Sequence, residues 1–229
     1  MNTLTSADEI KSRGPSAGGW PRLGTALETL AVYAGILYYI WRGQFTFPLG
    51  WVPLLAVILL SHCAHHDTFR SLGLAGAGLR ASSEVVFPLA LAIFIPLLVY
   101  GFARHALALL RPTPNALLSL AGYAVWCLAQ QYLTQSYFHN RLMSVIPNRH
   151  VTSALVGVMF GSAHIPNPIL MVATTLAGFI FAEIFARHRN IWPLALAQAL
   201  GGFLLAAVSP ASLMHNMRVG PGYFFFGLR

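Results

Sequence analysis

Polar side chains that could perform acid–base chemistry interrupt three otherwise apolar stretches of this chain. Gln130 and Gln131 lie in the first stretch, His164 ends the second, and Gln198 lies in the third, about 34 residues apart in each case. A polar group without a partner is costly in an apolar environment, so such residues are informative. An imidazole can act as a general base, and an amide can donate a hydrogen bond to a developing oxyanion. We expect these four side chains to converge on one catalytic pocket.

Neighbouring residues extend this set. Gln135 follows Gln131 by four residues and shares its helix face. Phe160 lies one helical turn before His164, and Asn167 follows the proline that ends that helix. We predict that Gln135, Phe160 and Asn167 support substrate binding. A plainer interpretation makes the polar groups interhelical hydrogen bonds worth about 0.6–2 kcal/mol each.

Membrane helices must position these residues, because the composition is not that of a soluble protein. Of the 229 residues, 56% are hydrophobic and only 9% are charged, and the mean hydropathy is +0.63. Soluble domains carry about 25% charged residues. A span needs about 20 apolar residues, so we predict an all-α, polytopic transmembrane helical bundle of about seven spans, with six to eight possible. The apolar runs are 24–41, 47–62, 82–103, 116–138, 151–164, 169–187 and 191–208.

The chain divides into a polar amino-terminal segment (1–23), a single transmembrane domain (24–208) and a carboxy-terminal tail (209–229). No signal-peptide core precedes the first run, so that run would itself direct insertion. Nine basic residues fall on the amino-terminal side of this topology and five on the other side. This asymmetry favours a multi-pass protein of the cell (inner) membrane with a cytoplasmic amino terminus. The scattered arginines predict membrane lipid, and no nucleic acid, as a partner.

The order of the polar motifs resembles that of the CPBP family of intramembrane proteases. This family includes type II CAAX prenyl proteases and bacteriocin-processing or self-immunity (Abi) proteins, and its pattern is EExxxR, FxxxH and HxxxN on successive membrane helices. The pattern falls here on residues 130–135, 160–164 and 198–202, within a resemblance that covers about residues 50–208. The resemblance implies a CPBP-like fold, a hydrolase that acts as an intramembrane endopeptidase, and a prenylated or otherwise lipidated peptide as substrate, with no cofactor.

Only the middle motif is intact. The other positions carry Gln130, Gln131, Gln135, Gln198 and Gly202 in place of two glutamates, an arginine, a histidine and an asparagine. In the family, as the resemblance implies, the first glutamate and the middle histidine activate water, while the third histidine and the asparagine hold the oxyanion. A carboxamide has no basic site near neutral pH, so His164 would be the sole base.

Two interpretations therefore stay open: a peptidase with an altered Gln/His site, or a catalytically silent relative that acts as a membrane chaperone, immunity or scaffold protein. His139 and Glu183 are conceivable substitutes for the missing base. Their plainer interpretations are an interfacial position for His139 beside Arg141 and an ion pair of Glu183 with Arg187 one turn later.

A further alternative comes from the run His62-Cys-Ala-His-His66. Its HxxHH spacing is that of membrane di-iron desaturases and hydroxylases (oxygenases), in which histidines at one helix end ligate metal. Such sites need several histidine boxes, and the other six histidines of this chain are isolated. We therefore predict no metal site and expect this run to cap its helix near the membrane interface.

Overall fold

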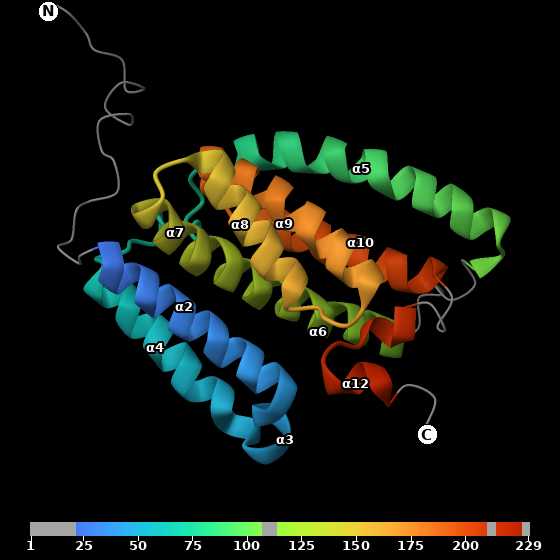
Figure 1. The fold of residues 1–229 in the computed structure, drawn as a ribbon. Coiled ribbons are helices and arrows are strands. Elements are labelled where there is room, and N and C mark those ends of the chain that lie inside the picture. Colours follow the sequence, from blue (N-terminus) through green and yellow to red (C-terminus); the bar gives the residue numbers. More distant parts are fainter. Residues whose placement is uncertain (1–21, 107–113, 210–213, 226–229) are drawn as a thin grey trace, which may run out of the picture.

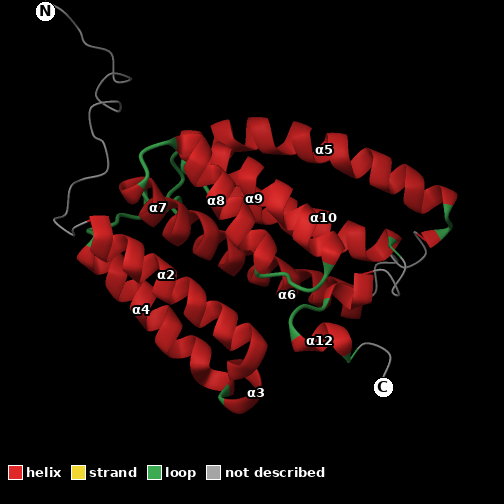
Figure 2. Ribbon diagram, viewed as in Figure 1, coloured by secondary structure: helices red, strands yellow, loops and turns green. Residues whose placement is uncertain are grey.

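The computed structural model describes residues 22–106, 114–209 and 214–225 (Figure 1). The predicted polar segment 1–23 lies almost entirely outside these ranges. Helices joined by loops make up the described ranges, which contain no strand (Figure 2). The all-α prediction is thus confirmed.

A helix occupies each of the predicted apolar runs. Pro168 and Pro193 stand at the starts of two of them, where a missing N–H removes no intrahelical bond. The principal elements are α2 (Arg22–Tyr38), η1 (Tyr39–Gly43), α3 (Gln44–Thr46), η2 (Pro48–Gly50), α4 (Trp51–Ala64), α5 (Leu79–Ala103), α6 (Pro114–Gln131), η4 (Tyr132–His139), α7 (Asn140–Val145), α8 (Arg149–Ser162), α9 (Pro168–His188) and α10 (Trp192–Val208).

Three helical segments are long and apolar enough to cross a membrane, judged by length and composition. They are Arg22–Thr46, Leu79–Ala103 and Pro168–His188, and the shorter segments Pro48–Ala64 and Trp192–Val208 are also apolar. On α5, Val99 and Phe102 are 63% and 75% exposed. A helix with such side chains uncovered by protein suits contact with lipid tails.

A helical hairpin and a single long helix lie on opposite sides of the molecule (Figure 1). α2 and α4 form a hairpin on one side and α5 runs along the other, with α8, α9 and α10 between them. One apolar core joins α9 and α10 through Phe185 and Leu194. A second core joins α2, α4 and η4 through Val32, Ile58 and Tyr137.

Small residues let α8 and α9 approach closely. A side chain at Gly161 would meet Thr175 Oγ1 at 1.8 Å, and one at Gly157 would meet the Thr175 main-chain oxygen at 2.7 Å. The two glycines have the G-x-x-x-G spacing that permits close helix packing in membranes. Because α8 ends at Ser162 and α9 begins at Pro168, this packing fixes the short turn that carries His164.

The loop between α4 and α5 is anchored to the helices. Ser136 Oγ of η4 donates to the Leu72 main-chain oxygen at 2.5 Å, and the Ile191 N–H donates to the Gly73 oxygen at 3.1 Å. The Leu-Gly-Leu segment at 72–74 is thus hydrogen-bonded both to η4 and to the residue before α10.

Residues 214–225 form a segment that we call the C-terminal strap, which contains η5 (His215–Met217) and α12 (Pro221–Phe224). The Gly220 N–H donates to the Ile165 main-chain oxygen at 2.8 Å. Asn167 Nδ2 donates to two main-chain oxygens of the strap at 2.9 and 3.3 Å. This part of the tail is therefore fastened to the turn between α8 and α9.

Candidate active site

Three glutamines form a hydrogen-bonded chain between α6 and α10. Gln131 Nε2 donates to Gln198 Oε1 at 2.6 Å, and Gln198 Nε2 donates to Gln130 Oε1 at 2.5 Å. Gln130 and Gln131 end α6 just before the π-helical η4, and Gln198 lies in the second turn of α10. Because an amide can both donate and accept, Gln198 links the two helices within an apolar bundle.

His164 lies two residues after α8 ends, and its ring is held in one orientation. His164 Nδ1 lies 2.7 Å from the Phe160 main-chain oxygen and 3.3 Å from Thr174 Oγ1, whose hydroxyl donates to the Leu170 oxygen. A carbonyl oxygen only accepts, so in the neutral ring Nδ1 carries the proton and Nε2 carries the lone pair. The Phe160 ring packs edge-to-face against the imidazole at 5.0 Å. The unprotonated Nε2 is the nitrogen that can act as a base.

One cavity connects these groups. His164, Gln130 and Gln198 line a cavity of about 1180 Å³, whose wall is otherwise largely apolar. Met217 and Val219 of the C-terminal strap form part of the wall. The volume exceeds the roughly 300–1,000 Å³ of pockets for drug-sized ligands.

The predicted site residues fall into two groups. Phe160 lines the cavity with His164, Gln130 and Gln198, and Gln131 contacts this group through its bond to Gln198. The fold therefore brings together the residues that we assigned to catalysis, from α6, α10 and the turn after α8.

The other two predicted residues lie away from the cavity wall. Gln135 is fully buried, and neither its oxygen nor its nitrogen has a hydrogen-bond partner among the described residues. Asn167 Oδ1 accepts from the Leu170 N–H at 3.2 Å and so caps α9, while its amide nitrogen holds the strap. This geometry gives Asn167 a structural role.

Sequence reasoning missed Tyr123, which also lines the cavity. Tyr123 lies seven residues before Gln130, which is about two helical turns and puts both side chains on one face of α6. This periodicity is the signal that could have found it. No comparable periodicity in the sequence indicated that Met217 and Val219 of the strap would line the cavity.

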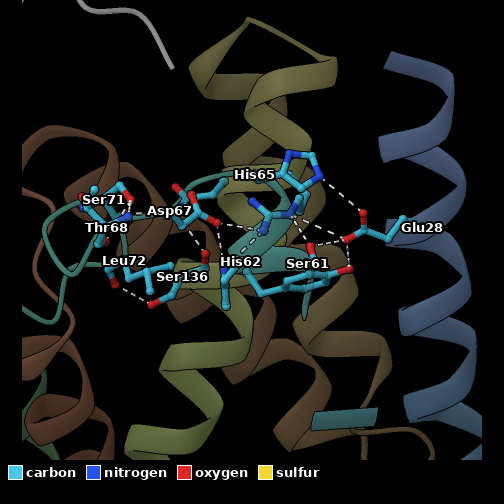
Figure 3. A network of polar contacts seen from close by, with 12 residues as sticks. Glu28, Ser61, His62, His65, Asp67, Thr68, Ser71, Leu72 and Ser136 are labelled. Atoms are coloured by element: carbon cyan, nitrogen blue, oxygen red, sulfur yellow. Dashed lines mark hydrogen bonds and ion pairs between the residues drawn. The ribbon is translucent and has the colours of Figure 1, made fainter. Parts of the chain in front are cut away.

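Figure 3 shows part of a second polar group, which we call the polar network. None of its members lines the cavity. Its members are Glu28, Ser61, His62, His65, Asp67, Tyr137 and Arg141. Arg141 Nη2 donates to Asp67 Oδ2 at 2.8 Å, and Arg141 Nε lies 3.6 Å from Glu28 Oε1. The Tyr137 hydroxyl donates to the same Glu28 oxygen at 2.7 Å. The network thus ties α2 and the loop after α4 to η4 and α7.

The HxxHH run belongs to this network. His62 Nδ1 donates to Asp67 Oδ2 at 2.7 Å, whereas His65 Nε2 lies 3.4 Å from Glu28 Oε2, and His66 is exposed. Within the described ranges, no three His, Cys, Asp or Glu side chains are grouped so that they could hold a metal ion. The three histidines therefore do not form the shared ligand set that a di-iron site needs.

Asp67 lies outside the candidate spans, and its charge is stabilised by its neighbours. Burial would raise the pKa of Asp67, but hydrogen bonds from His62 and Arg141 and the positive charge of Arg141 outweigh burial and lower this pKa below its ordinary value. Asp67 is therefore ionised near neutral pH.

His139 and Arg141 both lie inside the protein. His139 is fully buried and Arg141 is 2% exposed. The Arg141 charge is tolerated inside the protein because two carboxylates surround it. The expected pair of Glu183 with Arg187 is present, at 3.9 Å, although Arg149 approaches Glu183 more closely, at 3.0 Å.

Comparison with known proteins places part of the chain in a family. Residues 112–204 match the family model described as Type II CAAX prenyl endopeptidase Rce1-like. The matched range contains all three motif positions, 130–135, 160–164 and 198–202. No curated protein and no solved structure matches the chain.

Proposed function

Because residues 112–204 form a type II CAAX prenyl endopeptidase Rce1-like domain, we propose that the protein is an intramembrane peptidase. It spans the cell membrane about seven times, with its amino terminus in the cytoplasm. Its substrates are membrane-associated or lipidated peptides, which enter the cavity between the helices.

The observation that carries this proposal is the placement of His164. Its Nδ1 is bound to the Phe160 oxygen, so the basic Nε2 remains for chemistry in a cavity that Gln130 and Gln198 also line. A proton of a water molecule moves to Nε2 as the water oxygen bonds to the scissile carbonyl carbon. The second N–H of Gln198 Nε2 donates to the resulting oxyanion. When the C=O bond re-forms and the C–N bond breaks, His164 returns the proton to the leaving amine.

The cavity wall supports a substrate with a long apolar part. Its residues are mostly aliphatic and aromatic, and its polar side chains are few. Burial of an apolar chain contributes about 25 cal/mol per Å² of apolar surface, which can anchor a lipidated peptide while its amide bond meets the polar groups.

The test is a cleavage assay on the full chain reconstituted in liposomes, with a fluorogenic peptide that carries a farnesylated cysteine. We expect wild type to cleave it and His164→Ala to lose at least a hundredfold in rate, since a general base contributes about 10²–10⁴-fold. His150→Ala, a histidine change on α8 outside the cavity, is the matched control and keeps wild-type activity. Equal rates for wild type and His164→Ala would refute the mechanism.

A silent membrane chaperone, immunity or scaffold protein is the second candidate, and one observation favours it. The three glutamines are hydrogen-bonded to one another in the absence of a substrate. In this case wild type binds the peptide without cleaving it, and cleavage appears only in Gln130→Glu, which puts a carboxylate base into the cavity that His164 lines.

A further inference from the structure

Most hydroxyl groups on the cavity wall already donate to main-chain oxygens. The Tyr33 hydroxyl donates to Met159, the Tyr39 hydroxyl to Pro48, and the Thr174 hydroxyl to Leu170. These hydrogen bonds engage each hydroxyl with the protein. A ligand could therefore bind one of these hydroxyl groups only if a structural hydrogen bond were lost.

The Tyr123 hydroxyl differs from them. It lies beside the thiol of Cys127, one turn further along α6, within hydrogen-bonding reach. A thiol is a weak acceptor, so the phenolic O–H retains most of its capacity to donate. In an apolar cavity, a strong donor with only a weak acceptor is poised to bind an oxygen atom of a ligand.

The absence of a side chain at Gly202 leaves room for the Tyr123 hydroxyl. A Cβ added at Gly202 would lie 2.2 Å from Tyr123 Oη and 3.0 Å from two ring carbons. Any side chain at position 202 would thus collide with the phenol. The hydroxyl occupies the space that a residue of α10 would otherwise fill.

This contact lies beside the glutamine chain. Gln198 precedes Gly202 by four residues on α10, and Gln130 follows Tyr123 by seven on α6, so each pair shares one helix face. Gln130 and Gln198 form a hydrogen bond across the interface between α6 and α10. Tyr123 contacts Gly202 across the same interface, one turn further along α10. All four residues line the cavity.

We propose that Tyr123 is a catalytic residue whose hydroxyl donates a hydrogen bond to the scissile carbonyl oxygen, and that Gly202 is required because it leaves room for this hydroxyl. The inference rests on the proposed function. It gives the oxyanion a second donor, in addition to the Gln198 amide.

Tyr123→Phe tests the donor directly, because it removes one oxygen and keeps the ring. With the farnesylated peptide, we expect kcat/KM to fall at least tenfold, mostly through kcat, since the bond strengthens as charge develops on the oxygen. Tyr100→Phe, which removes a hydroxyl from α5 away from the cavity wall, is the control. If wild type cleaves the peptide and Tyr123→Phe cleaves it equally well, the role of Tyr123 is refuted while the proposed function stands.

A double variant separates chemistry from packing. Gly202→Ala alone should lower the melting temperature because of the clash, and Tyr123→Phe in the same chain should restore much of the stability without restoring activity. Recovery of both would show that Tyr123 only fills space and would overturn the proposal.

If wild type fails to cleave, the peptidase proposal fails, and equilibrium binding of the same peptide decides the role of the hydroxyl. At least a fivefold weaker Kd for Tyr123→Phe would support donation to the peptide carbonyl. An equal Kd, or no binding by wild type, would overturn it.

Discussion

Gln131 and Gln135 are one helical turn apart and are both fully buried, yet their hydrogen bonding differs. Gln131 donates to Gln198 through Nε2 while its own Oε1 has no partner among the described residues, whereas Gln135 has no partner there at either amide atom. A buried polar group without a partner retains its desolvation penalty, of about 1–3 kcal/mol. Of the two amides, only that of Gln131 offsets part of this penalty with a hydrogen bond.

We predict that Gln135→Leu raises the stability of the protein by about 1 kcal/mol, because it replaces an unpaired amide with an apolar side chain of similar size. Gln131→Leu is the matched comparison and should lower stability by about 1–3 kcal/mol, because it leaves Gln198 Oε1 without its donor. Thermal unfolding of the detergent-purified variants measures both changes. A lower melting temperature for Gln135→Leu would mean that its amide is paired in solution.

At the scale of the elements, the contact of α8 with α9 determines where His164 lies. A Cβ at Gly161 would be 1.8 Å from Thr175 Oγ1 and 2.9 Å from the Met171 main-chain oxygen. Overpacking of this kind costs about 1–3 kcal/mol and moves the backbone. A small shift of the α8 end would move the imidazole relative to Thr174 of α9 and to the glutamines on the cavity wall.

We predict that Gly161→Ala lowers the melting temperature and reduces peptide cleavage at least tenfold. Gly122→Ala is the control, because Gly122 lies in α6 with no atom within 4 Å of an added Cβ. Alanine is the better helix former by about 0.5–1 kcal/mol, so this variant should be at least as stable as wild type. Stability equal to wild type for Gly161→Ala would contradict the packing that we describe.

The elements were the most predictable part of the molecule. The apolar runs located the helices to within a few residues, because hydrophobic length is a property of the sequence itself. The π-helical form of η1 and η4 was not predictable, since it depends on contacts with other helices. Gln130, His164 and Gln198 were recognisable as polar residues that interrupt apolar runs, and all three line one cavity.

At the scale of the whole molecule, charged residues were harder to interpret. Arg141 lies between apolar runs like the other arginines, and only the fold shows that Asp67 and Glu28 surround it. Likewise, Asn167 lies three residues after His164 in sequence, but its partner is the C-terminal strap, about 50 residues further along. Such partners come from long-range packing and leave no local pattern.

The polar network predicts how stability depends on pH. The pKa of Asp67 is lowered in the folded protein, so its carboxylate contributes stability above the ordinary pKa of about 3.9 and loses it as the pH falls through the lowered pKa. Asp67→Asn should lower stability by about 3 kcal/mol near pH 7, because it removes a charge partner of the buried Arg141. Thermal unfolding between pH 3 and 7 should show this difference unchanged above about pH 5 and shrinking below about pH 4. A difference independent of pH over this range would contradict the assignment.

The C-terminal strap has a consequence for how genetic lesions in this protein are interpreted. A premature stop codon after Ser209 would leave α2 to α10 translated in full. The product would nevertheless lack Met217 and Val219 of the cavity wall, and Asn167 would lose its main-chain acceptors. Such an allele would encode every helix that carries a candidate site residue and still leave the cavity open where the strap closes it.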